Sequence, residues 1–111
     1  MEITIKLTYN QLTELIKALQ EDRILLENTS KSIAERANRD LFNSVMRKLL
    51  KKQISKSELQ TPNNTFSMKF QYYAAFSLWQ NLLSVDIRDN YRMAICMTIR
   101  DYLHQNLMSY E

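Results

Sequence analysis

The sequence contains no glycine in its 111 residues. Glycine is the residue that most readily takes positive φ and that lets a backbone approach a ligand closely. P-loops, dinucleotide-binding loops and nucleophile elbows all need glycines at fixed positions. The sequence therefore excludes these three motifs, and its helices must end without a glycine cap.

Cysteine, histidine and proline occur once each, as Cys96, His104 and Pro62. A lone cysteine forms no intramolecular disulfide, and a lone histidine without a neighbouring cysteine argues against a zinc site. On one straight helix, about 12 Å of axial rise would separate Cys96 from His104, too far for a hydrogen-bonded pair. We expect Cys96 to be a buried thiol. The sequence predicts no catalytic residue, no metal site and no cofactor.

Long apolar runs are also missing, because none approaches the roughly 18 residues of a membrane span. Met1 leads directly into Glu2, without the basic and apolar regions of a secretory signal. Together with the lone cysteine, these features predict a cytoplasmic protein that does not enter a membrane.

The length of 111 residues fits one domain, 1–111, and a chain of this size can bury a core without disulfides or metal. An apolar fraction of 45% with 24% charged residues is ordinary for a globular protein and argues against disorder. The net charge of +3 is mildly basic, so its distribution is more informative than its size.

Two short segments alternate between apolar and polar residues, which is typical of half-buried strands. In 3–8 the inward set is Ile3, Ile5 and Leu7, and the outward set is Thr4, Lys6 and Thr8. In 66–71 the inward set is Phe66, Met68 and Phe70, and the outward set is Ser67, Lys69 and Gln71. The sequence therefore predicts one strand in each half of the chain.

Helical spacing follows each strand. Thr8 and Gln11 form a capping-box pattern, which predicts a helix from Thr8 to about Glu27. Ser32 and Glu35 form a second such pattern at the start of a long helix that ends near Gln53.

Two further helices are predicted after the second strand, on either side of a break at 84–89. The apolar residues at helical spacing in the first are Tyr72, Ala75, Phe76, Trp79, Leu82 and Leu83. Those in the last helix are Tyr91, Ile95, Ile99, Tyr102, Leu103 and Leu107. We expect these residues to face the core.

The halves, about 1–54 and 65–111, match in pattern across a polar linker at 55–64. A shift of 63 positions superposes the two strands and brings Lys6 onto Lys69 and Tyr9 onto Tyr72. We therefore expect a helix-rich α+β domain of two βαα units. Its two strands would form an antiparallel ribbon packed on four helices, because two strands alone are marginal in water.

This pattern resembles the ribbon-helix-helix family of DNA-binding proteins, in a tandem, pseudo-dimeric version. The resemblance rests on the two alternating segments and the helices that follow them. It implies that the ribbon enters the major groove of double-stranded DNA and that its outward side chains read bases. The residues in those positions are Thr4, Lys6, Thr8, Ser67, Lys69 and Gln71.

The stretch 31–56 carries eight basic residues against two acidic ones, a net +6, so the remainder of the chain is acidic. Arg36, Arg47 and Lys48 are candidates for a phosphate-contacting surface beside the ribbon. For Lys51 and Lys52 we favour another role, because cations in the last turns of a helix complement its dipole.

A second hypothesis is a protein-interaction or homo-oligomerising module, with a protein partner or a homodimer and no nucleic acid. Tyr73 falls off the helical stripe and is expected to be exposed, and exposed aromatics with the six methionines favour an interface. Glu14 and the other scattered acids are expected to be solubilising. A deep pocket lined by glutamate, tyrosine and His104 would revive an enzyme hypothesis.

Overall fold

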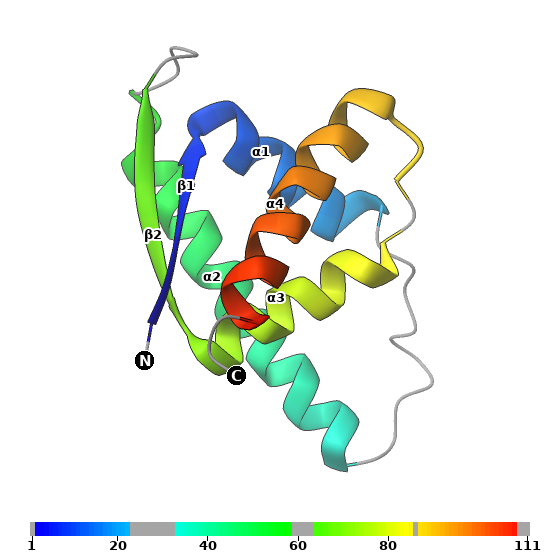
Figure 1. Cartoon of the computed structure of the whole chain (residues 1–111). Coiled ribbons are helices and arrows are strands. Elements are labelled where there is room, and N and C mark those ends of the chain that lie inside the picture. Colours follow the sequence, from blue (N-terminus) through cyan, green and yellow to red (C-terminus); the bar gives the residue numbers. More distant parts are fainter. Residues whose placement is uncertain (1, 23–32, 59–63, 86, 109–111) are drawn as a thin grey trace.

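Two strands and the helices that follow them make up the described chain. The computed structural model describes residues 2–22, 33–58, 64–85 and 87–108, without the side chains of 21–22, 33–38 and 84. Its elements are β1 (Glu2–Thr8), α1 (Tyr9–Lys17), the π-helical turn η1 (Ala18–Asp22), α2 (Ile33–Ser55), β2 (Thr65–Gln71), α3 (Tyr72–Ser84) and α4 (Asn90–Met108) (Figure 1). The predicted helix-rich α+β fold of two βαα units is confirmed.

β1 and β2 pair antiparallel along their whole length, within one chain, with Ile5 opposite Met68. These two residues are also equivalent when the halves are superposed by the shift of 63, since 68 minus 5 is 63. A register that sets equivalent residues opposite each other relates the strands by an approximate two-fold axis through that pair. Lys6 and Lys69 therefore occupy related positions on either side of the axis.

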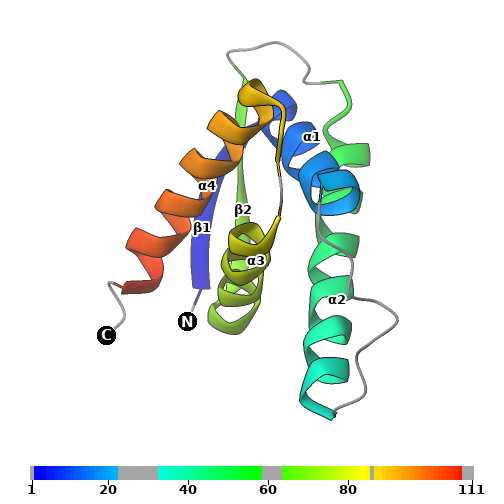
Figure 2. The ribbon, with the colours of Figure 1, turned by 90° about the vertical axis from the view of Figure 1, so that its right-hand side faces the viewer.

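The helices lie on one side of this ribbon and bury its apolar face (Figure 1). Turned by 90°, the structure shows α4 and α2 on either side of α3, with the strands behind (Figure 2). Helix positions equivalent by the shift of 63 are buried in both halves, including Leu15 and Leu78, each 0% exposed. Removal of this apolar surface from water is the main stabilising contribution. The inward strand residues are Ile3, Ile5, Leu7, Phe66, Met68 and Phe70, all buried.

Local chemistry sets where α1 begins. The Thr8 hydroxyl accepts a hydrogen bond from the Gln11 backbone N–H at 3.1 Å, and the Gln11 side chain accepts one from the Thr8 N–H at 2.9 Å. The predicted capping box is therefore confirmed. No described residue takes positive φ, in keeping with a chain that has no glycine.

The other predicted boundaries are met closely where the structure describes them. α2 ends at Ser55 rather than Gln53, and β2 begins at Thr65, so the first linker residue belongs to the helix. The predicted end of the first helix at Glu27 and the capping box at Ser32 lie outside the described residues.

The predicted inward stripes of α3 and α4 are partly wrong. Phe76 is 39% and Leu83 52% exposed on α3, where Leu78 is fully buried instead. On α4, Tyr91 and Tyr102 are exposed, and Cys96 is buried as expected. Each helix has a wide stripe of apolar residues, and only part of its width is packed against the core. The spacing of apolar residues in the sequence does not show which part that is.

Glu14 is buried and is not the solubilising surface acid that its pattern suggested. Its carboxylate oxygen Oε1 lies 3.2 Å from Nε of Arg92 on α4, and Oε2 lies 3.7 Å from Nζ of Lys17. The Glu14 and Arg92 side chains are 11% and 14% exposed, so this pair is largely withdrawn from water. It joins α1 of the first half to α4 of the second.

Replacing Glu14→Ala should lower the free energy of unfolding by about 3 kcal/mol, because it removes one member of a largely buried ion pair. Chemical denaturation monitored by circular dichroism measures this. The control Lys17→Ala removes the more exposed partner, at 47%, and should cost less than about 0.5 kcal/mol. Equal losses in the two variants would contradict a structural role for the Glu14–Arg92 pair.

Candidate nucleic-acid interface

The outward face of the ribbon gathers all six strand residues that the sequence assigns to it. At its centre Thr4 lies opposite Lys69, and Lys6 lies opposite Ser67. Both lysines and Ser67 are exposed, and Thr4 is half-buried. At the two ends, Thr8 lies opposite Thr65 and Gln71 lies opposite Glu2. The described helices lie on the other side of the ribbon, so none of them covers this polar face (Figure 1).

The second half of α2 runs beside β2. Nζ of Lys48 lies 4.7 Å from the centre of the Phe70 ring, and Nζ of Lys56 lies 5.9 Å from the centre of the Phe66 ring. The Lys48 ammonium also donates a hydrogen bond to the backbone oxygen of Lys69. Lysine side chains of this kind protect an edge strand from pairing with another chain. They also bring the cations of α2 to the ribbon.

A groove of about 500 Å³ separates α2 from β2. It contains five cations, and no acidic residue is among its described lining. Lys69 belongs both to this groove and to the outward ribbon face, so the two surfaces are continuous. We call it the α2–β2 groove; its lining is Ser44, Arg47, Lys48, Lys51, Lys52, Ser55, Met68 and Lys69.

Lys51 and Lys52 belong to this surface, whereas their place in the sequence favoured a dipole-stabilising role. Arg47 and Lys51, like Lys48 and Lys52, are four residues apart and share a helix face. Like charges at this spacing destabilise a helix by a few tenths of a kcal/mol per pair. Their spacing in the sequence already indicates that the four cations share one face of the helix. The packing of α2 against β2 then places that face at the ribbon. The side chain of Arg36 lies outside the described residues.

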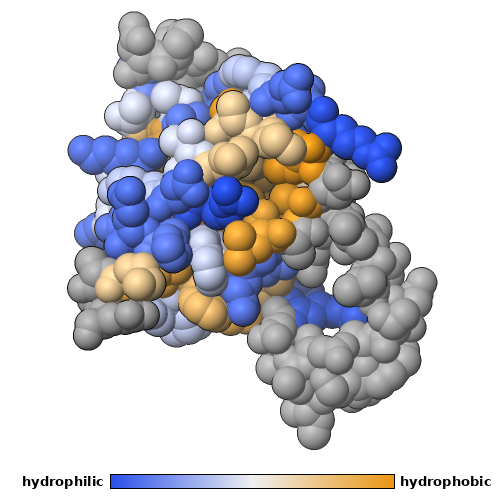
Figure 3. Space-filling model, turned by 45° about the vertical axis from the view of Figure 1, so that its right-hand side comes forward, coloured by the Kyte–Doolittle hydropathy of each residue, from blue (hydrophilic) through white to orange (hydrophobic). Residues whose placement is uncertain are grey.

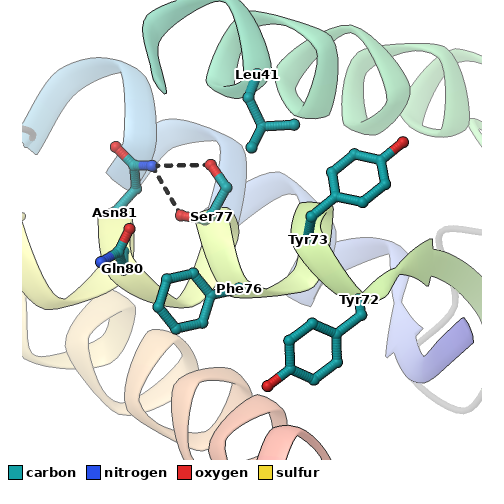
Figure 4. A pocket seen from close by; sticks show the side chains of 7 residues that line it. All are labelled: Leu41, Tyr72, Tyr73, Phe76, Ser77, Gln80 and Asn81. Atoms are coloured by element: carbon teal, nitrogen blue, oxygen red, sulfur yellow. Dashed lines mark hydrogen bonds between the residues drawn. The ribbon is translucent and has the colours of Figure 1, made fainter. Parts of the chain in front are cut away.

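A second pocket, of about 420 Å³, lies between α2 and α3 (Figure 4). The Asn81 side-chain amide donates to the backbone oxygen of Ser77 at 2.8 Å, so part of the pocket's polarity is already engaged. Its described lining includes neither glutamate nor His104, which stacks on Trp79 at a centroid distance of 5.5 Å instead. The described lining therefore differs from the pocket that would revive an enzyme hypothesis. The lining is Leu41, Tyr72, Tyr73, Phe76, Ser77, Gln80 and Asn81.

Apolar side chains gather on another face, over α3 and α4 (Figure 3). Leu83, Met93 and Met97 are 52%, 39% and 43% exposed. With Val85 they line a small hollow of about 100 Å³. We call these four residues the apolar patch. Tyr73, exposed as predicted at 62%, lines the α2–α3 pocket instead.

The described residues contain no group of three or more histidine, cysteine, aspartate or glutamate side chains placed to hold a metal ion. None of the described helices combines the length and apolar character needed to cross a membrane.

Comparison of the chain with protein-family models, curated proteins and solved structures found no match.

Replacing Lys48→Ala should lower the free energy of unfolding by about 1 kcal/mol, because it removes a cation–ring contact and a hydrogen bond to the edge of β2. The exposed Lys51, one turn further along α2, is the control, and Lys51→Ala should change stability by less than about 0.5 kcal/mol. Thermal and chemical denaturation of both variants measure the difference. If the Lys48 variant is as stable as wild type, the contacts of Lys48 hold its ammonium group in place without stabilising the fold.

Proposed function

We propose that this protein is a non-catalytic binding protein that contacts double-stranded DNA through its β1–β2 ribbon, aided by the basic helix α2. One observation carries the proposal: the polar face of the ribbon continues, through Lys69, into a groove that contains five cations. The tandem resemblance to ribbon-helix-helix proteins supports the same use, with both strands supplied by one chain.

The chemistry of the ribbon face suits base recognition. A two-stranded ribbon fits the major groove of B-DNA, where lysine can donate to guanine and glutamine can pair with adenine. Lys6 and Lys69 would supply the guanine contacts and Gln71 an adenine contact. Thr4 and Ser67 are short hydroxyl side chains beside the lysines and let the ribbon approach closely.

Other residues would position the ribbon. The Thr8 hydroxyl oxygen is already an acceptor in the cap of α1, so its hydrogen remains to donate to a phosphate. Arg47 and Lys48 on α2 would contact phosphates. Phosphate contacts of this kind fix orientation and supply most of the salt-dependent affinity.

The test is fluorescence anisotropy of a labelled duplex of mixed sequence, titrated with protein at several salt concentrations. Wild type should bind, and more weakly as salt rises. In Arg47→Ala/Lys48→Ala, which removes two phosphate-contacting cations, the slope of log affinity against log salt should flatten by about 1.8, because each neutralised phosphate contributes about 0.9. Lys6→Ala/Lys69→Ala removes two base contacts and should weaken binding at every salt concentration.

The control for net charge is Lys17→Ala/Arg88→Ala, which removes two cations from exposed positions outside the ribbon face. Its slope should equal that of wild type. If wild type fails to bind the duplex even at low salt, the proposed function is wrong.

The apolar patch favours a second candidate function, a protein-interaction or homo-oligomerising module. Soluble monomers usually scatter their exposed apolar residues, whereas a contiguous patch is typical of an interface. Methionine is suited to such a surface because its flexible side chain adapts to different partners.

Sedimentation velocity tests whether the patch joins copies of this chain. Self-association through the patch predicts a concentration-dependent dimer in wild type and a monomer in Met93→Ser/Met97→Ser. The control Tyr91→Ser alters an exposed residue of α4 outside the patch and should still dimerise. A wild type that is monomeric at every concentration would exclude homo-oligomerisation.

A further inference from the structure

The two flanks of the ribbon differ in charge although the strands are related by an approximate two-fold axis. α2 lies beside β2, and α4 is its counterpart beside β1. In the described side chains of α2, residues 39–55 contain five basic residues and one acidic residue, a net +4. α4 contains two basic residues and one acidic residue, a net +1.

The cations of α4 are also placed differently from those of α2. Nε of Arg92 lies 3.2 Å from the Glu14 carboxylate, in a largely buried pair. Nε of Arg100 lies 3.7 Å from the Asp101 carboxylate. Each arginine of α4 therefore faces an acid, which lowers its attraction for an external anion. The α2–β2 groove has no acid in its described lining.

We propose that the α2–β2 groove is a phosphodiester site that holds the backbone of one DNA strand beside the ribbon, with no matching site on the α4 side. This inference rests on the proposed function and deepens it. Because only one flank holds phosphate, a duplex would bind in one orientation, and the preferred DNA sequence would not be a palindrome.

The groove fits a phosphate backbone better than it fits a base edge. Four of its five cations lie on α2 between Arg47 and Lys52, along about one and a half helical turns, so they can follow successive phosphates. Its volume of about 500 Å³ is within the range of known ligand sites. Lys69 lines the groove and also belongs to the outward face of the ribbon. A DNA strand bound in the groove would therefore continue directly onto the ribbon.

The measurement is the salt slope of duplex binding in two matched double variants. Lys51→Gln/Lys52→Gln removes two groove cations that lie on α2 and belong to neither β1 nor β2. Arg88→Gln/Arg100→Gln removes two cations at and before α4. The groove variant should flatten the log–log slope by about 1.8, and the α4 variant should leave it unchanged. Thermal denaturation confirms that both variants are folded.

Each outcome has a distinct meaning. Wild-type binding with an unchanged slope in the groove variant, or with equal losses in both variants, would overturn the groove site and leave the ribbon proposal standing. Vesicles containing phosphatidylserine form a parallel arm. Wild type that binds these vesicles and not the duplex would overturn the groove inference together with the proposed function.

Discussion

The pairing of β1 with β2 is the constraint on which the rest of the structure depends. Two strands have too little apolar surface to be stable alone in water, so their inward face must be covered by helices. β1 and β2, one from each half of the chain, meet with Ile5 against Met68, and this register brings both sets of helices to the same side. The contacts between α1 and α4, and between α2 and α3, join the two halves and follow from that meeting.

The alternation of the strands and the Thr8–Gln11 cap were predictable because both depend on neighbours in sequence. The burial of Glu14 was not, because its partner Arg92 lies 78 positions away on another helix. Likewise, the exposure of Phe76 and Leu83 depends on which flank of α3 meets its neighbours. Residue type and period set the width of an apolar stripe, whereas packing decides how much of it is covered.

The candidate site divides in the same way. Its ribbon half was predictable, since a half-exposed strand must place Lys6 and Lys69 on the face opposite its apolar residues. Its groove half was predicted only in part: Arg47 and Lys48 were candidates, whereas Lys51 and Lys52 were not, because they also suit a solvated helix end. The contacts of Lys48 with the Phe70 ring and the Lys69 backbone oxygen show that α2 lies against β2. They also place the other cations of that side of the helix beside the strand.

Carrying both strands on one polypeptide has a consequence for how such a surface can evolve. In a homodimer every substitution appears twice, so both flanks of a ribbon must change together. Here the second helix of each half is encoded separately, and one is rich in cations while the other is not. A single chain also forms its ribbon independently of protein concentration, whereas an obligate dimer is stable only above the concentration at which its subunits associate. Because both halves are on one chain, the charge of one flank can change while the core that both halves build stays the same.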